Sequence, residues 1–249
     1  MEQSRKKFLK HFLIGATSVP LILEACKKND VTTSSDTGSG TETGSGSGSC
    51  IASPTETAWP FPSKTPSTLV RSDITADRTG VAITINITIN NNNNSCAALA
   101  GAIVDIWHCD KDGYYSEYGG SGMQSVDYTD VHFLRGRQTT DANGLVSFTS
   151  IFPGWYSGRT THTHVHIYNA SGTSLLVTQI AFPGGSSSAV ATVNGSGGTA
   201  YGYTKGMSGY TYNAADNVFS DDTTGVEIAT FTGSLSAGYI LAHTIKVAA

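Results

Sequence analysis

The chain has 249 residues and a formal net charge of −4, with only 14% of its residues charged. This balance provides no basic patch of the kind that binds nucleic acid, so we expect no nucleic-acid partner. The 28 glycines, together with many threonines, serines and asparagines, favour a β-rich extracytoplasmic protein over a helical one.

The N-terminus has the pattern of an export signal. A basic stretch from Ser4 to Lys10 precedes an apolar run, Phe12 to Leu23, that is too short to span a bilayer stably. The last residue of this run, Leu23, begins the sequence Leu-Glu-Ala-Cys, which ends at Cys26 and resembles a bacterial lipobox. We therefore expect residues 1–26 to be a lipoprotein-type signal. A lipid on Cys26 would attach the protein to a membrane of the bacterial cell envelope, facing the periplasm or the cell surface.

Two alternatives for this signal stay open. It could be an ordinary secretory signal in which Cys26 has no role. The basic stretch also resembles a twin-arginine signal in which Lys6 stands in place of the second arginine. Residues 27–49 are rich in glycine, serine and threonine and are expected to be a flexible linker, which leaves residues 50–249 as one folded domain.

Three cysteines lie in the predicted domain, an odd number in a compartment that permits disulfides. Cys96 and Cys109 flank a predicted strand that would hold them apart. A bond from Cys50 to one of them is therefore expected, and the sequence leaves open which.

Residues 50–249 have the pattern of strands separated by turns. Val81 and four isoleucines alternate with polar residues over 81–89, a period of two that indicates a half-buried strand. Further strands are expected at 102–108, 145–151, 161–168, 175–182, 190–193, 226–232 and 239–247. No segment has a convincing helical period. The spacing and the glycine-rich turns predict an all-β fold, an antiparallel β-sandwich.

Histidines at alternate positions of one predicted strand are the strongest chemical signal. His162, His164 and His166 are three of only seven histidines in the chain. Because residues two apart in a strand point the same way, His162 and His164 present two imidazoles to one side and can chelate a metal. The alternative is a polar strand face without a metal.

Two tyrosines are candidate metal ligands because of their positions in the sequence. Tyr156 precedes the histidines, and Tyr115 follows a strand at a turn marked by glycine, with Tyr114 as its nearest rival. A tyrosine is usually a core or surface residue, but a phenolate is a hard anionic donor suited to Fe(III), and a trivalent ion can displace the phenol proton. Two phenolates and two imidazoles would leave one or two coordination positions open for a diol.

Four stretches of the chain together resemble the intradiol ring-cleavage dioxygenases, the relatives of catechol 1,2-dioxygenase and protocatechuate 3,4-dioxygenase. The resemblance extends from about Cys50 to the C-terminus and is strongest from Gly101 to Phe182. The stretches are WHCDKDGYYS at 107–116, FLRGRQTTD at 133–141, FPGWY at 152–156 and GRTTHTHVH at 158–166.

The resemblance implies a mononuclear non-haem Fe(III) held by Tyr115, Tyr156, His162 and His164. Arg159 would lie over the substrate and stabilise the charge that develops on its ring, with a surface or structural ion pair as the alternative.

The resemblance also implies lesser roles. Gln138 would be a residue near the substrate or behind the ligands, unless it caps a turn near Thr140. Trp107 and His108 would support the first ligand loop, and His166 would flank the site.

The implied reaction uses O2 to cleave a catechol-type aromatic between its two hydroxyl-bearing carbons, giving a cis,cis-muconate-type dicarboxylate. One tyrosine ligand would be displaced by the incoming diol. The chain lacks the helical N-terminal dimerisation segment of the catechol enzymes, so the oligomeric state is open. Two alternative functions stay open. One is a copper or zinc protein whose ligands are histidines alone, His162, His164, His166 and His132. The other is a non-catalytic binding module at the cell surface on the same β-sandwich fold.

Overall fold

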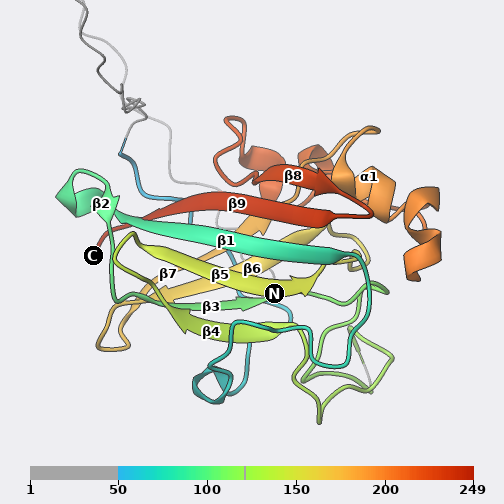
Figure 1. Cartoon of the computed structure of the whole chain (residues 1–249), viewed down its shortest axis with the longest axis horizontal. Coiled ribbons are helices and arrows are strands. Elements are labelled where there is room, and N and C mark those ends of the chain that lie inside the picture. Colours follow the sequence, from blue (N-terminus) through green and yellow to red (C-terminus); the bar gives the residue numbers. More distant parts are fainter. Residues whose placement is uncertain (1–49, 121) are drawn as a thin grey trace, which may run out of the picture. The chain divides into compact units, whose positions relative to one another are not determined.

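Nine strands in two sheets make up the framework of the computed structural model, which describes residues 50–120 and 122–249 (Figure 1). The first sheet contains β1 (Ala82–Asn91), β2 (Ala97–Ala98), β5 (Leu145–Ile151), β8 (Thr230–Ser234) and β9 (Gly238–Val247). The second contains β3 (Ile103–Trp107), β4 (Arg135–Thr139), β6 (His162–Tyr168) and β7 (Ser174–Ala181), in the order β4-β3-β6-β7. The predicted signal and linker, Cys26 included, lie outside the described residues.

The core between the sheets follows from the alternating pattern of the strands. In β1 the isoleucines at 83, 85, 87 and 89 are at most 1% exposed, whereas the residues between them are not buried. They share one apolar cluster with Ile106 of β3 and with Val165 and Ile167 of β6. Because inward-facing residues of both sheets meet in one core, the structure confirms the predicted β-sandwich.

One strand pair departs from the predicted antiparallel arrangement. β1 pairs with β9 in parallel, from Ile83 opposite Tyr239 to Asn91 opposite Val247. On its other edge β1 pairs antiparallel with β5 and then with β2. The C-terminal strand β9 therefore lies inside the first sheet, between β1 and β8.

The helices of the described residues are short, and four of the six lie between β7 and β8. They are α1 (Ala189–Val193) and the 3₁₀ turns η1 (Pro66–Thr68), η2 (Asn92–Asn94), η3 (Ser196–Tyr201), η4 (Asn213–Ala215) and η5 (Phe219–Asp221). The strand predicted at 190–193 is wrong, because these residues form α1. The Ser188 side chain caps this helix by accepting from the Ala191 amide, and Val190 and Val193 are buried on one helical face.

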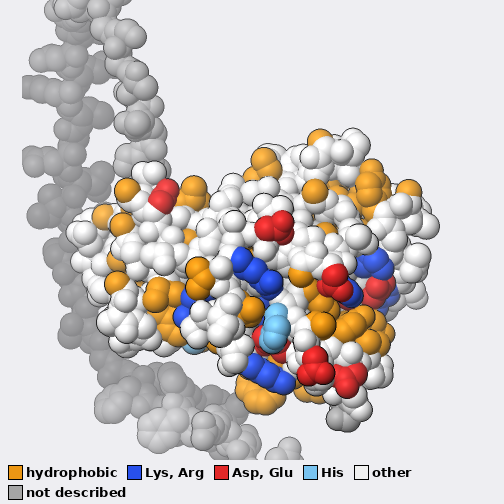
Figure 2. Space-filling model, turned by 60° about the horizontal axis from the view of Figure 1, so that its bottom comes forward, with side chains coloured by type: hydrophobic (Ala, Val, Ile, Leu, Met, Phe, Trp, Pro, Cys, Tyr) orange, Lys and Arg blue, Asp and Glu red, His pale blue; other side chains and the backbone are white. Residues whose placement is uncertain are grey.

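Other strands also differ from the prediction. The predicted ranges do not include β2 or β4, and β8 begins four residues after the predicted start at 226. In the described part of the chain, no helix combines the length and the apolar character needed to cross a membrane. On the face drawn in Figure 2, acidic and basic side chains are interspersed.

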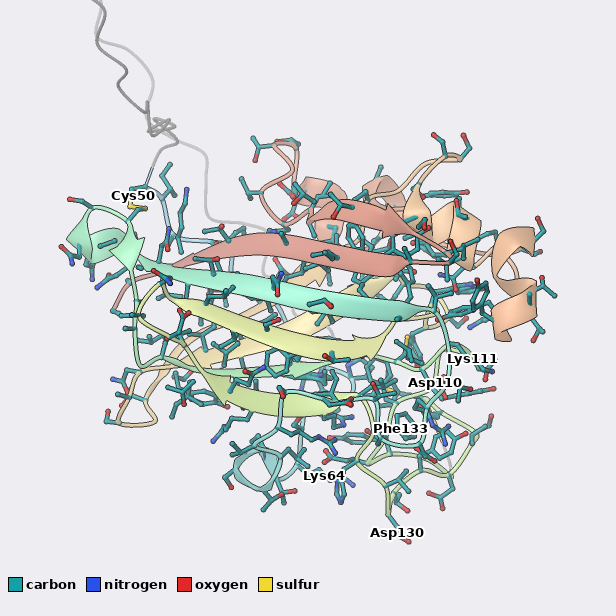
Figure 3. All side chains as sticks on the ribbon, viewed as in Figure 1. Cys50, Lys64, Asp110, Lys111, Asp130 and Phe133 are labelled. Carbon is teal, nitrogen blue, oxygen red and sulfur yellow. A yellow bond between two sulfur atoms is a disulfide. The ribbon has the colours of Figure 1, made fainter. Side chains whose placement is uncertain are left out.

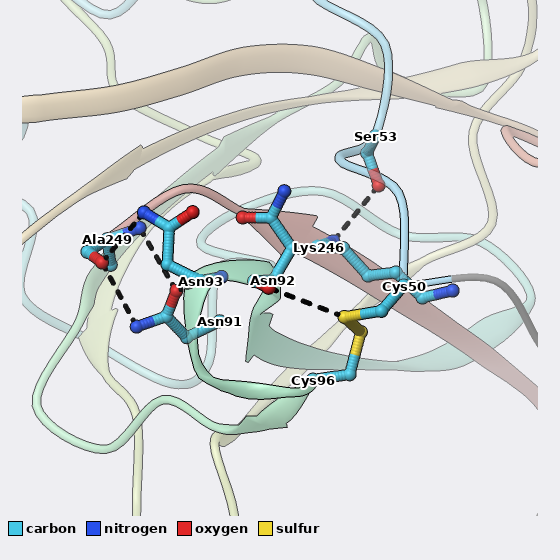
Figure 4. Close-up of a disulfide and its surroundings, with 8 residues drawn as sticks. All are labelled: Cys50, Ser53, Asn91, Asn92, Asn93, Cys96, Lys246 and Ala249. Carbon is cyan, nitrogen blue, oxygen red and sulfur yellow. Dashed lines mark hydrogen bonds between the residues drawn. A yellow bond between two sulfur atoms is a disulfide. The ribbon is translucent and has the colours of Figure 1, made fainter.

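A disulfide joins Cys50 to Cys96, with a Cα–Cα distance of 5.7 Å, while Cys109 is a buried free thiol (Figure 4). The bond ties the start of the described chain to the turn that follows β1. Close by, the Lys246 amide donates to the Ser53 hydroxyl at 3.0 Å. Figure 3 places Cys50 at the opposite end of the sandwich from Asp110 and Lys111, which belong to the first of the four motifs.

Candidate metal centre

The two histidines of the centre lie on the outer face of the second sheet. In β6, Val165 and Ile167 point into the core between the sheets. His162 and His164 have the opposite parity, so they point to the other face, where loops cover them and leave them 2% and 0% exposed. The alternation recognised in the sequence therefore places two imidazoles side by side in a dry environment.

The neighbouring strands support the His164 ring. In the register of the sheet, His164 lies opposite Trp107 of β3 and opposite Gln179 of β7. The Trp107 ring is stacked on the His164 ring, with centroids 4.9 Å apart and planes within 1° of parallel. This stacking limits rotation of the imidazole and keeps its ring plane fixed.

Three predicted ligand atoms lie close together around His162. The Nε2 atoms of His162 and His164 are 3.1 Å apart, and the Tyr115 hydroxyl lies 3.2 Å from His162 Nε2. Ligands bound at right angles to a metal about 2.0–2.1 Å away are separated by about 2.9 Å. The spacing of the two nitrogens is therefore that of a metal chelate.

Proton positions also favour metal binding. His162 Nδ1 is 2.6 Å from the Thr160 carbonyl, which can only accept, so Nδ1 carries the proton and Nε2 keeps its lone pair. Burial lowers the pKa of both His162 and His164 well below the ordinary value, which keeps them neutral. Burial also raises the pKa of Tyr115 well above its ordinary value, so a bound cation must supply the stabilisation that its phenolate needs.

Tyr115 and its rival Tyr114 have different surroundings. Tyr115 is 1% exposed and its ring is stacked on Phe61 at a centroid distance of 4.6 Å. Tyr114 points elsewhere, with its ring 6.4 Å from that of Tyr128. Gln124 fixes the backbone at Tyr115, accepting from its amide at 2.7 Å and donating to its carbonyl at 2.8 Å. Of the two tyrosines, Tyr115 is the one that the structure brings to the histidines.

Tyr156 lies beside the cluster, but its hydroxyl is directed away from it. The Tyr156 ring is 6.2 Å from that of Tyr115 and contacts Phe61 edge-on at 5.2 Å. Its hydroxyl donates to the Met123 carbonyl at 2.8 Å. Tyr156 also forms part of the wall of a pocket of about 450 Å³, which Tyr114, Met123 and other residues complete. The fourth predicted ligand therefore stands between the cluster and an open pocket.

Arg159 is 7% exposed and held by two partners. Its Nε donates to both carboxylate oxygens of Asp216, at 3.1 and 2.9 Å, and its Nη2 donates to Gln179 Oε1 at 2.7 Å. Gln179 in turn donates to the Thr57 carbonyl at 2.8 Å. The structure thus gives Arg159 the ion pair that the alternative interpretation expected, and places that ion pair three residues before the predicted ligand His162.

The remaining predicted residues lie outside the cluster. Gln138, on β4 opposite Val104, donates to the Ser147 carbonyl and is not brought to the ligands. His166 contacts Ser174 and Tyr168 through its two ring nitrogens. His108 is bound by the Cys109 carbonyl and the Ser150 hydroxyl, at 2.8 Å each.

The His-only arrangement is not formed. His132 Nδ1 lies 2.8 Å from Glu117 Oε1, and His166 binds its own neighbours, so neither joins His162 and His164. Among the described residues, no three His, Cys, Asp or Glu side chains come together as a metal site. The cluster is a mixed one of imidazole and phenol, and this donor set fits Fe(III).

Four contributors to the site were missed in the sequence: Phe61, Gln124, Gln179 and Asp216. Gln179 is a polar residue within the apolar strand predicted at 175–182, and its burial at 1% exposure could have been suspected from that position. Phe61 and Asp216 lie in irregular segments on either side of the motifs in sequence, where no periodic pattern marks them.

Comparison with known proteins identifies the family. The family model described as dioxygenase matches residues 59–196, more than half of the chain. The chain belongs to the intradiol ring-cleavage dioxygenase family. The matched range includes all four predicted ligands and also Arg159, whereas Asp216 lies beyond it.

Individual relatives agree with this assignment. The chlorocatechol 1,2-dioxygenase of Rhodococcus opacus is 30% identical over 139 residues, which are 48% of this chain and 49% of that protein. Catechol 1,2-dioxygenase 1 of Acinetobacter lwoffii is 38% identical over 58 residues, 23% of this chain and 17% of that protein. The chain thus spans half or less of the length of these curated relatives.

A solved structure matches over a larger share. The intradiol ring-cleavage dioxygenase from Tetranychus urticae superimposes with a TM-score of 0.65 at 29% identity, covering 80% of this chain and 94% of that one. The similarity therefore extends over almost the whole of that enzyme.

Proposed function

We propose that this protein is a mononuclear non-haem Fe(III) intradiol dioxygenase acting on a catechol-type substrate with O2. The reaction adds both atoms of one O2 to the ring and cleaves it between the two hydroxyl-bearing carbons, giving a cis,cis-muconate-type dicarboxylate. The observation that carries the proposal is the grouping of three side chains around His162, whose Nε2 lies 3.1 Å from His164 Nε2 and 3.2 Å from the Tyr115 hydroxyl, with the Tyr156 ring adjacent.

The ligands divide into a fixed set and a displaceable one. Tyr115, His162 and His164 are at most 2% exposed and are held by stacking or hydrogen bonds. When bound, Fe(III) supplies a Lewis acid that chelates an ortho-diolate and withdraws electron density from its ring. The three fixed residues would hold the ion and leave space beside it for the diol.

Tyr156 is proposed as the ligand that the diol displaces. Its phenolate oxygen takes a proton from a diol hydroxyl and then donates it in a hydrogen bond to the Met123 carbonyl. The 2.8 Å bond between these two groups is the arrangement expected for the released, protonated tyrosine. The pocket of about 450 Å³ beside Tyr156 provides space for substituents on the substrate ring.

Arg159 supplies positive charge beside the reacting ring. Its guanidinium is buried in a region of low dielectric, where a fixed charge stabilises developing negative charge more than it does in water. Trp107 and Phe61 cover the ligands with apolar surface and exclude water from them. A monophenol provides one oxygen instead of two and is not expected to be turned over.

The test is product identification after incubation of the iron-loaded protein with catechol under labelled O2. Mass spectrometry should find both labelled atoms, mostly in the ring-opened dicarboxylate. A yellow semialdehyde, a simple quinone, or no incorporation of label across a panel of hydroxylated and alkylated catechols would contradict the proposal. A non-catalytic binding module would consume no oxygen with any of them.

We also propose that the protein is lipid-anchored at Cys26 in the bacterial cell envelope. The support is the lipobox-like sequence that ends the apolar run at residues 12–23. The mature protein should partition with membranes, and Cys26→Ser should release or mislocalise it. Wild-type protein found only in the cytoplasmic fraction would contradict this proposed location.

A further inference from the structure

Asp216 is a buried carboxylate with donors on all sides. It is 0% exposed and lies at the end of η4, in a part of the chain that the family model does not match. Its Oδ1 accepts from Arg159 Nε at 3.1 Å and from the Val218 amide at 2.8 Å. Its Oδ2 accepts from Arg159 Nε at 2.9 Å and from the Thr160 amide at 2.7 Å. One side chain therefore joins the segment before β6 to the segment that covers it.

The first consequence concerns the guanidinium of Arg159. Asp216 holds Nε and Gln179 holds Nη2, so two nitrogens of the planar group are fixed. Within residues 50–120 and 122–249, Nη1 has no hydrogen-bond partner. The two anchors fix the plane of the group and leave Nη1 available to a bound substrate.

The second consequence concerns His162. Asp216 binds the amide of Thr160, and the carbonyl of Thr160 binds His162 Nδ1 at 2.6 Å. The hydroxyl of Thr160 is held as well, by Asn213 Oδ1 at 2.6 Å and the Tyr210 hydroxyl at 2.7 Å. A fixed carbonyl at Thr160 fixes the tautomer and the ring orientation of His162.

We propose that Asp216 is a positioning residue that orients Arg159 toward the substrate and His162 toward the metal at the same time. The inference rests on the proposed function for what the two oriented groups do. It assigns to the segment at 210–219 a part in the centre that none of the four motifs contains. Tyr210 and Asn213 also help to position His162, because both bind the hydroxyl of Thr160.

The test compares Asp216→Asn with Asp221→Asn. Asparagine has the shape of aspartate, but one of its two terminal atoms is an NH2 group that can only donate. Both oxygens of Asp216 accept hydrogen bonds from N–H groups, so in either orientation the NH2 group would face N–H donors and those bonds would be lost. Asp221 is the matched control, because it lies in the same covering segment, on η5, is exposed, and its side chain makes no hydrogen bond to Arg159. Both variants are purified with iron, and kcat, KM, iron content and the visible spectrum are recorded.

We expect Asp216→Asn to retain iron while kcat falls roughly 10²-fold, the loss that misplacement by about 1 Å causes, with a smaller change in KM. The tyrosinate-to-iron absorption band should shift, because the His162 ring is no longer held. Asp221→Asn should match the wild type in all four measurements. Equal kcat and identical spectra in the two variants would overturn the proposal.

A second measurement uses the wild-type protein and does not depend on the variant folding. In the ¹H–¹⁵N spectrum of iron-free protein, the Arg159 Nε–H should exchange slowly with solvent, and its signal is assigned by its loss in Arg159→Ala. Exchange as fast as that of an exposed arginine would overturn the positioning role. A wild type without dioxygenase activity would refute the proposed function instead, and the Nε–H measurement would still decide whether Asp216 holds Arg159.

Discussion

Removal of the Cys50–Cys96 disulfide should destabilise the domain substantially. The two cysteines are 46 residues apart in the sequence. Closing a loop of that length restricts the unfolded chain by an entropy that corresponds to about 4 kcal/mol at 25 °C. For a domain of this size, that loss should lower Tm by roughly 8–16 °C. The metal centre should survive at moderate temperature, because the disulfide lies at the opposite end of the sandwich from the first motif.

The assay is thermal unfolding followed by circular dichroism for the wild type and for Cys50→Ser/Cys96→Ser, each with and without reductant. Reductant should lower Tm of the wild type to that of the double variant and leave the double variant unchanged. A difference below about 2 °C between oxidised and reduced wild type would refute the reasoning, because it would mean that the cross-link restricts the unfolded chain far less than its loop length requires.

Three further predictions concern the centre itself. Tyr115→Phe should bleach or shift the visible band of the iron-loaded protein while Tyr114→Phe leaves it unchanged; the opposite result would reverse the ligand assignment. Arg159→Ala should keep iron bound, measured by metal analysis, and lower kcat roughly 10²–10³-fold, and unchanged turnover would remove the arginine from the mechanism. Burial lowers the pKa of His108 to about 4, and His162 is also held neutral, so the unfolded state binds more protons below pH 6.5. The free energy of unfolding of the iron-free protein should therefore be highest above pH 6.5 and fall by about 1.4 kcal/mol per such histidine for each pH unit below it. Urea unfolding midpoints measure this, and midpoints that stay constant from pH 7 to 5 would contradict the prediction.

Alternation along the chain predicted most of the sandwich. Strands such as 145–151 and 239–247 have one buried and one exposed face, and a period of two identifies that environment directly. The error at 190–193 has a physical cause. Four residues of the type Val-Ala-Thr-Val favour a strand by propensity, but the Ser188 cap and the burial of two valines three apart stabilise a helical turn.

The parallel pairing of β1 with β9 could not be predicted from local pattern. The same alternation serves a parallel or an antiparallel neighbour, and the choice depends on which distant segment reaches the free edge of β1. The alternation and the turn spacing predicted the fold class, but they carried no signal for this pairing.

In the candidate site, too, residues that follow a local pattern could be predicted, whereas a residue that acts through a distant contact could not. His162 and His164 were found because two ligands on one strand are a local pattern. Tyr115 was preferred to Tyr114 on the family resemblance, and the structure shows a physical difference between them, the burial of Tyr115 against Phe61. Asp216 is 57 residues from Arg159 in sequence, and an isolated aspartate in a loop carries no mark of a contact at that distance.

The position of β9 has a consequence for how the chain folds. β1 is made early, yet its parallel partner is about 150 residues further along, so this pair closes a very long loop and raises the contact order, which slows folding. Until β9 arrives, the edge of β1 that β9 will cover remains unpaired and can associate with strands of other molecules. The interval between synthesis of the two strands is therefore the period in which this domain is most prone to aggregate. A chain crossing a membrane unfolded would meet that hazard again on the far side, whereas a chain exported after folding would not.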